Sequence, residues 1–424
     1  MSDGGRGNSR RGEIEEILER KSGTREARDE EDRYTVVGAA NRQTFANWLT
    51  PIEEHFVCHR NDMPDADAES WQLRVTNVDD EKSLSMKALR EEYPTVAVAH
   101  TMECAGNNRG QHDPETGSVQ WGWEAVGNAM WSGTPVRAVL EDCGVDVNDD
   151  SERWLTAVGG DVPADDDVYV KSIPLAKALD DCILADEMNG RTLPVEHGYP
   201  VRLVVPGWYG TNSVKWVEEL RITDTMVTDA TFADEEDGRT YTYWQHGAYR
   251  IHPADAEPDI EETVPTADTW DQLVGDVEYP YTFDENVMSL IGKPDGGHPV
   301  TPDANGRVEI RGVAWAGDDK VTRVEISTDD GESWHDADLY GPNYSGAWRL
   351  FTHTWKPKSE TESTVTLLSR ATDEKGRTQP SSIKVLDDWA EIPEDTYPWN
   401  EGGYAANAYR PNGVEVQIKS RGDK

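Results

Sequence analysis

The strongest constraint on the fold of this 424-residue chain is a change in hydrophobic period near residue 286. Before that point, strand-like alternation, as in residues 71–75, is mixed with helical stretches such as 136–143. After it, apolar residues recur in two-residue steps, and Asp330-Gly331 is typical of a tight hairpin turn. The sequence therefore predicts an α+β fold, in which a mixed α/β domain precedes an antiparallel β-sandwich of immunoglobulin type.

The same patterns divide the chain into three parts. Residues 1–32 are polar and charged, and we expect them to be a mobile N-terminal segment, with a short surface helix after Arg10-Arg11. Residues 33–285 form the first domain, with strands expected at 96–99, 201–205 and around 214–216. The acidic, Pro- and Thr-rich residues 226–285 are interpreted as an extended connection at its end, and residues 286–424 form the sandwich.

The charge balance narrows the choice of partners. The chain has 82 acidic and 41 basic residues, so its net charge is −41, which disfavours binding to nucleic acid or to an anionic membrane. No apolar run approaches the roughly 18 residues that a membrane span needs, and the acidic segment after Arg10-Arg11 does not resemble an export signal, so we expect a cytoplasmic protein. The acidity is read as a solvated surface, with adaptation to high salt as the sharper interpretation.

Among the four cysteines, Cys104 is the one that stands in a chemically distinctive setting. It follows the predicted buried strand and begins a loop of small and amide residues, in which Gly106 permits close approach of a ligand to the backbone. Nearby Arg109 is expected to lower the pKa of the thiol and so to favour the thiolate that binds metals. Taken alone, a cysteine after a strand is more often a core residue.

A second cluster of polar residues lies between 193 and 216. His197, Arg202 and Lys215 stand near glycine-rich turns, which offer backbone N–H groups to an anion. Cationic side chains beside exposed amides are suited to binding a phosphate, although solvated loop charges explain the pattern equally well on local grounds.

Together these segments resemble the sulfite oxidase family of molybdenum-cofactor oxidoreductases, over about residues 50–418. The resemblance is carried by Cys-Ala-Gly-Asn-x-Arg (104–109), Ala-Met-Trp-Ser-Gly-Thr-Pro (129–135), the His-Gly-x-Pro-x-Arg segment (197–202) and Ser-Val-Lys-Trp (213–216). Residues 324–334, 370–373 and 399–407 resemble the family's dimerisation domain. The resemblance implies a molybdopterin-binding domain followed by that dimerisation domain, and a prokaryotic, halophilic source.

The resemblance also implies roles for individual residues. Cys104 would be the thiolate ligand of molybdenum. The residues that would hold the molybdopterin are Asn61, Asp161, His197, Arg202, Ser213, Val214 and Lys215. The residues that would form the substrate pocket are Arg60, Arg109, Tyr169 and Trp121, with Trp123 as the alternative to Trp121.

The implied activity is oxygen-atom transfer that oxidises sulfite to sulfate. The chain contains no recognisable haem or flavin domain, so electrons are expected to pass to a separate acceptor, and a homodimer is expected. Three positions depart from the family pattern: Asp62 replaces a histidine, while Asn108 and Gly402 replace arginines.

The loss of a positive charge at Gly402 keeps a second hypothesis open, in which the same scaffold reduces nitrate or a sulfoxide such as methionine sulfoxide. A third hypothesis is a non-catalytic assembly protein that retains the cofactor fold. The presence of Cys104, Arg60, Arg109 and Tyr169 argues against the third, because a protein without turnover does not need that set.

Overall fold

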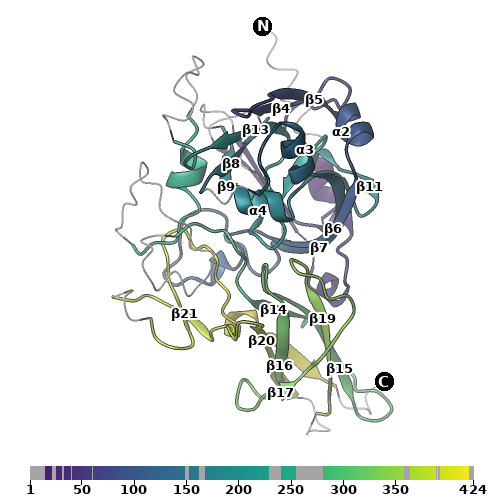
Figure 1. Ribbon diagram of the computed structural model, residues 1–424. Helices are drawn as coiled ribbons and strands as arrows, with labels where there is room; N and C mark the ends of the chain where they lie inside the picture. Colours follow the sequence, from purple (N-terminus) through teal and green to yellow (C-terminus); the bar gives the residue numbers. More distant parts are fainter. Residues whose placement is uncertain are drawn as a thin grey trace.

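The chain folds into a mixed α/β domain and a β-sandwich that lie one below the other in Figure 1. The computed structural model describes residues 15–21, 25–30, 33–39, 41–59, 61–148, 152–161, 168–228, 240–254, 280–357, 363–387, 389 and 392–419. No helix in these ranges is both long and apolar enough to cross a bilayer.

Two five-stranded sheets form the first domain. The first sheet has the order β11-β10-β7-β6, with β12 paired to β10, and the second has the order β5-β4-β13-β8-β9. The pairs are antiparallel except β4 with β13. The strands of the first sheet are β6 (Val96–Glu103), β7 (Val126–Pro135), β10 (Ile183–Met188), β11 (Arg191–Thr192) and β12 (Arg202–Val204). Those of the second are β4 (Gln72–Thr76), β5 (Lys82–Ser85), β8 (Trp154–Gly159), β9 (Val170–Pro174) and β13 (Val217–Thr223).

Local sequence explains these elements. In β4 exposed and buried residues alternate, with Leu73 and Val75 fully buried, as the period of two predicts. The helix α3 (Val136–Asp142) buries Val139 and Leu140 and is followed by Gly144 at φ +82°, a left-handed conformation that favours glycine. With α2 (Met86–Glu92) and α4 (Leu175–Asp180), these elements enclose one hydrophobic core.

The second domain is the predicted β-sandwich. Its two antiparallel sheets have the orders β14-β15-β19-β18 and β17-β16-β20-β23. Asp330 and Gly331 both have positive φ, +57° and +87°, as the predicted turn requires, but the flanking strands pair only from Ile326 with His335, so the connection is a longer loop than the expected tight hairpin. The strands are β14 (Met288–Lys293), β15 (Val308–Trp315), β16 (Val321–Ser327), β17 (His335–Asp336), β18 (Asp338–Tyr340), β19 (Arg349–Trp355), β20 (Ser363–Asp373) and β23 (Val414–Ile418), and β21 (Ser382–Lys384) pairs with β22 (Thr396–Pro398) beside the sandwich.

Three parts of the structure differ from the sequence-based expectation. Residues 25–30, expected in a mobile segment, form β1 (Arg25–Glu30) in a sheet with β2 (Arg33–Gly38) and β3 (Val57–His59). The strand expected around 214–216 begins only at Val217, because Trp216 takes a left-handed φ of +51°. Residues 243–247 form a π-helical turn inside the supposed extended connection. The other short helical turns are η1 (Arg42–Ala46), η2 (Ile52–Glu54), η3 (Arg109–Gln111), η4 (Val195–His197), η5 (Gly210–Asn212) and η8 (Arg410–Asn412).

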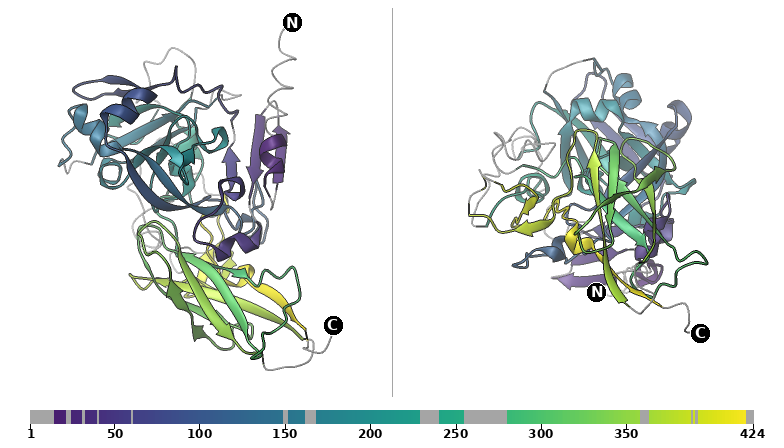
Figure 2. Two further views of the ribbon diagram at one scale, coloured as in Figure 1. Left: turned by 90° about the vertical axis from the view of Figure 1, so that its right-hand side faces the viewer. Right: turned by 90° about the horizontal axis from the view of Figure 1, so that it is seen from below.

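The strand β6 is bonded to both domains. The backbone N–H of Thr101 donates to the carbonyl of Gly346 at 2.7 Å, and Trp348 N–H donates to the Thr101 hydroxyl at 2.7 Å. Near its end, the indole of Trp315 donates to a Glu103 carboxylate oxygen at 3.0 Å. The sandwich (green to yellow) therefore meets the mixed domain at the strand that leads to Cys104 (Figure 2).

Candidate functional site

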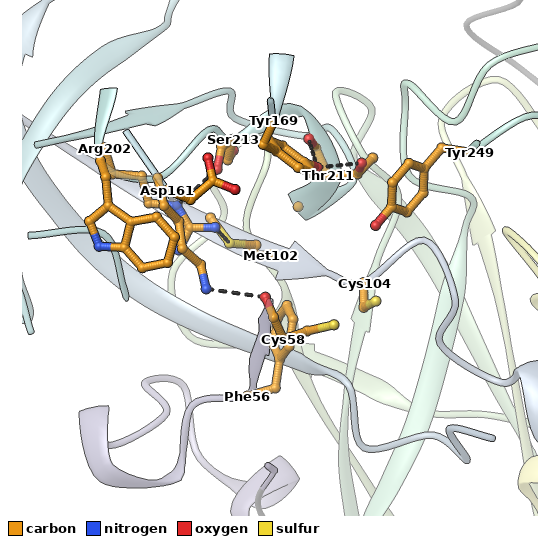
Figure 3. Close-up of a pocket in the computed structure, with 13 residues that line it drawn as sticks. Phe56, Cys58, Met102, Cys104, Asp161, Tyr169, Arg202, Thr211, Ser213 and Tyr249 are labelled. Atoms are coloured by element: carbon orange, nitrogen blue, oxygen red, sulfur yellow. Dashed lines mark hydrogen bonds between the residues drawn. The ribbon is translucent and has the colours of Figure 1, made fainter. Parts of the chain in front are cut away.

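A cavity of about 740 Å³, part of it open to solvent, lies in the mixed domain beside the end of β6. Figure 3 shows side chains from several separate segments of the chain that converge on it. The lining residues are Phe56, Cys58, Met102, Cys104, Asp161, Tyr169, Arg202, Gly210, Thr211, Ser213, Lys215, Trp216 and Tyr249.

Cys104 follows β6 directly, and its sulfur points into the cavity (Figure 3). A hydrogen bond with the Cys58 thiol, together with burial, raises the pKa of the Cys104 thiol well above its usual value, although the charge of Arg109 acts in the opposite direction. Arg109 therefore acts in the expected direction, but the Cys58 hydrogen bond and burial outweigh it, so the net pKa of the thiol is raised. A bound metal would displace the thiol proton. In the described ranges, no three His, Cys, Asp or Glu side chains converge to hold a metal ion.

Two buried cations line the cavity. Arg202 donates through Nε to the carbonyl of Ser213 at 3.1 Å and through Nη1 to that of His197 at 3.2 Å. The Lys215 amine donates to the carbonyl of Cys58 at 3.1 Å. Burial lowers the pKa of Arg202 to about 9, and burial followed by the charge of Arg202 lowers the pKa of Lys215 to about 7. Burying these charges is costly unless an anion compensates them, so the arrangement fits a phosphate group.

Unpaired polar atoms lie close to these cations. His197 Nε2 and Asp161 Oδ1 are buried and have no hydrogen-bond partner within the described part of the chain. The other carboxylate oxygen of Asp161 accepts from Asn61 Nδ2 at 2.6 Å, and burial raises the pKa of Asp161 to about 6. Buried polar groups are nearly always hydrogen-bonded, so these atoms fit a polar ligand such as a pterin with its phosphate. The side chain of Val214 is fully buried in the core, and its carbonyl accepts from the Leu203 N–H at 2.9 Å, so a contact with a ligand would come from its backbone N–H.

Of the predicted substrate residues that the structure describes, one lines the cavity and the others lie outside its lining. Tyr169 lines the cavity and donates its hydroxyl hydrogen to the carbonyl of Thr211 at 2.7 Å. Arg109 and Trp121 are buried and are not among the lining residues. Trp121 packs in a core cluster, and the alternative Trp123 packs edge-on to Phe45 at 5.6 Å between ring centroids. The prediction for Arg60 lies outside the described residues.

Arg109 connects the cavity region to the segment around Gly402. Its Nε donates to the carbonyl of Gly402 at 2.8 Å, and its guanidinium lies 5.0 Å from the ring centroid of Tyr404. A Cβ atom added to Gly402 would stand 2.1 Å from the Tyr404 ring. The ring of Tyr404 therefore takes the space that a side chain at position 402 would need. Asn108 adopts a left-handed φ of +65° and donates to the carbonyl of Ala406 at 2.9 Å.

Sequence reasoning missed several lining residues. Cys58 and Phe56 precede the quoted Arg60-Asn61 segment, and Met102 precedes Cys104, so their places could have been inferred from the neighbouring motifs. Tyr249 lay in the stretch interpreted as a connection. The only signal was a local excess of aromatic residues between 241 and 249 in an otherwise acidic segment.

Comparison with known proteins gives the same organisation. The family model described as "Oxidoreductase molybdopterin binding domain" matches residues 60–231, and that described as "Mo-co oxidoreductase dimerisation domain" matches residues 280–390. The structure is similar to the crystal structure of the sulfane dehydrogenase SoxCD from Paracoccus pantotrophus, with a TM-score of 0.69 over 96% of this chain and 92% of that chain. The sequences there are 24% identical, so this match shows the fold alone.

Curated relatives extend the comparison to sequence. The sulfite oxidase of Gallus gallus is 31% identical over 80% of this chain and 70% of its own length. A nitrate reductase [NADH] of Solanum lycopersicum is 29% identical over 81% of this chain and 37% of its own length. The chain spans 62% of the length of the mitochondrial sulfite oxidase of Mus musculus that it also matches. These similarities, with the ordered motifs around Cys104 and residues 197–216, show that the chain belongs to the sulfite oxidase-type family of molybdenum-cofactor oxidoreductases.

Proposed function

We propose that this protein is a molybdenum-cofactor enzyme that oxidises sulfite to sulfate. The observation that carries the proposal is the placement of the Cys104 thiol in one cavity with the buried cations Arg202 and Lys215. The similarity to sulfite oxidases supports the choice of substrate. In the overall reaction, sulfite and water give sulfate, two protons and two electrons, and a separate electron acceptor takes the electrons.

The bound cofactor would supply the oxygen-atom and electron transfer. Cys104 would hold the metal through its thiolate, as a soft ligand for a soft metal site. Arg202 and Lys215 would neutralise the cofactor phosphate, and the backbone of 213–215 would surround it. His197 and Asp161 would direct their unpaired atoms to the pterin, with Asn61 orienting the Asp161 carboxylate through the 2.6 Å hydrogen bond.

The substrate side of the cavity would be organised by Tyr169. Its hydroxyl donates to the Thr211 carbonyl and contacts the Thr211 hydroxyl, which fixes the ring at the cavity lining. Arg109 would act from behind the lining, since its guanidinium is already bonded to the carbonyls of Gly402 and Val119. Arg60 and Trp121 complete the proposed substrate residues.

One observation favours a second candidate, the reduction of nitrate or of a sulfoxide. Position 402 contributes no side chain, and the ring of Tyr404 fills the space beside it. The cavity therefore gains no positive charge from this position, which suits a monoanion or a neutral oxide better than a dianion. The similarity to a nitrate reductase is consistent with this candidate.

The test begins with metal analysis of protein made in a host that synthesises the cofactor. We expect close to one molybdenum per chain in the wild type and almost none in Cys104→Ser. Sulfite-dependent reduction of ferricyanide is then compared with oxidation of a reduced viologen by nitrate or methionine sulfoxide. Turnover in the first assay supports sulfite oxidation. Turnover only with the reducible substrates would reject it in favour of the second candidate.

We also propose the setting in which the enzyme works. The division into residues 33–285 and 286–424 is kept as the proposed domain organisation, except that β1 (Arg25–Glu30), which pairs with β2, is added to the first domain. The sandwich would form a homodimer, in line with the dimerisation family that it matches. The net charge of −41 supports a salt-rich prokaryotic cytoplasm, where screening reduces self-repulsion. Unfolding temperatures that rise steeply with potassium chloride would support this setting, and salt-independent stability would exclude it.

A further inference from the structure

Four aromatic rings form one wall beside the cavity. Tyr169 lies 5.4 Å from Trp244, Trp244 lies 6.3 Å from Tyr249, and Tyr249 lies 5.3 Å from Tyr404, all measured between ring centroids. We call these four residues the aromatic wall. Tyr169 and Tyr249 both line the cavity, so the wall borders the space in which a substrate would meet Cys104.

Tyr249 has a strained backbone within this wall. Its φ is +58°, a left-handed conformation that bulky residues rarely adopt, and it directly precedes the buried Arg250. Its hydroxyl oxygen points into the cavity from the side opposite Arg202 (Figure 3). Such strain persists only where the surroundings impose it, and it is concentrated at functional sites.

Lys171 stands behind Tyr249. It lies two residues after Tyr169 on β9, and its side chain is almost completely buried, with 2% of the residue exposed. Its amine is 4.6 Å from the ring centroid of Tyr249, and among the described residues this ring is the amine's partner. Burial lowers the pKa of Lys171 to about 7.

Burying the Lys171 amine in this position costs free energy of folding. A buried amine with neither a carboxylate nor a carbonyl partner loses its hydration, and a cation–π contact returns only part of that cost. Lys177, another largely buried lysine, is instead paired with the carboxylates of Asp181 and Asp318. Below about pH 7, where the folded protein keeps the Lys171 proton, this positive charge is left for something that enters the cavity.

We propose that Tyr249 donates its hydroxyl hydrogen to an oxygen atom of an anionic substrate, and that Lys171 is the positioning residue that holds and polarises Tyr249 from behind. An ammonium over the ring withdraws electron density from the phenol and makes it a stronger donor. Through the Tyr249 ring, the charge of Lys171 acts on the side of the cavity where Gly402 supplies no positive charge. The inference rests on the proposed function in one respect, the anionic character of the substrate.

The test uses the molybdenum-loaded enzyme at about pH 6, where Lys171 is protonated, and sulfate as the probe. Sulfate binding is measured by titration calorimetry, and KM and kcat are measured with sulfite. We expect Lys171→Met and Tyr249→Phe each to weaken sulfate binding roughly tenfold and to raise KM more than they lower kcat. Lys171→Arg, which keeps the charge, should stay within about threefold of the wild type. Lys87→Met removes the same charge from the exposed face of α2 and should change nothing.

A double variant separates a positioning role from a structural one. If Lys171 acts through Tyr249, Lys171→Met combined with Tyr249→Phe should bind sulfate about as well as either single variant, whereas independent effects would multiply to roughly a hundredfold loss. Multiplicative losses, or unchanged sulfate binding in Lys171→Met, overturn the proposal. If Lys171→Met fails to retain molybdenum, Tyr249→Phe decides, and sulfate binding within twofold of the wild type overturns it.

The proposed function and this inference can fail separately. A wild-type enzyme that binds sulfate but turns over only nitrate would reject sulfite as the substrate and leave the Lys171–Tyr249 pair to be judged by sulfate affinity. If the wild-type enzyme oxidises sulfite but every variant binds sulfate as well as the wild type does, the role of the Lys171–Tyr249 pair alone would be rejected. Failure of the loaded wild type to bind sulfate would also overturn the inference.

Discussion

The buried amine of Lys171 should make the protein measurably less stable than it could be. Replacing Lys171 with Met keeps the length of the side chain and removes the charge. Because burial lowers the pKa of Lys171 from an ordinary value of 10.5 to about 7, the folded state binds the proton more weakly than the unfolded state. At pH 7 this difference corresponds to about 4 kcal/mol of lost stability, which Lys171→Met should restore.

The sign of the pH dependence distinguishes this cause from better packing. Between about pH 7 and 10.5 the unfolded chain holds the proton and the folded chain does not, so the stability of the wild type rises with pH. The gain from Lys171→Met should therefore shrink from about 4 kcal/mol at pH 7 to about 1.4 kcal/mol at pH 9.5.

Urea unfolding of the metal-free protein at the two pH values measures this gain, with circular dichroism as the signal. The exposed Lys87→Met is the matched control and should stay within about 0.5 kcal/mol of the wild type at both pH values. A gain that does not change with pH, or a loss of stability at pH 7, would refute the reasoning.

Four further expectations follow from the site and the domain contacts. Cys104→Ser should keep the circular dichroism spectrum of the wild type and lose molybdenum and turnover; metal retained in full would overturn its assignment as ligand. Trp315→Phe removes the 3.0 Å donor to the buried carboxylate of Glu103 and should lower the free energy of unfolding in urea by about 1–3 kcal/mol, with no effect pointing to compensation by water. Gly402→Arg should lower the unfolding temperature, because its Cβ would meet the ring of Tyr404 at 2.1 Å, and adding Tyr404→Ala should recover most of the loss; equal stability of the single variant would contradict this. Light scattering in molar salt should give the mass of a dimer, about twice 47.4 kDa, and a monomer would contradict that expectation.

Periodicity predicted the architecture because the elements concerned are regular. The alternation in β4 and the glycine after α3 are local signals, and the structure follows both. The N-terminal strand β1 was missed because its residues, Arg-Glu-Ala-Arg-Asp-Glu, carry no apolar alternation and pair through the backbone with β2. The turn at Trp216 was missed because a left-handed tryptophan has no sequence signature.

The candidate site was predictable where residues lie within motifs. Cys104, Arg202, Ser213, Lys215, Asp161 and Tyr169 converge on one cavity. Their convergence came from the resemblance to a family, since spacing alone does not bring residues more than 100 positions apart together. Tyr249 and Lys171 were not foreseen, because a positive φ and a cation over a ring are tertiary features. Arg109 was expected at the substrate and instead bonds to two carbonyls behind it.

The hydrogen bonds that tie β6 to the sandwich have a consequence for domain exchange. Thr101 and Glu103 stand three positions and one position before Cys104. Thr101 donates to Gly346 and accepts from Trp348, and Glu103 accepts from Trp315, all in the second domain. A chimera that joined this mixed domain to the sandwich of a relative at a linker would break those bonds unless the incoming domain carried the same donors. The two domains should therefore be exchanged together, because recombination between them should yield proteins in which the strand leading to Cys104 has lost part of its support.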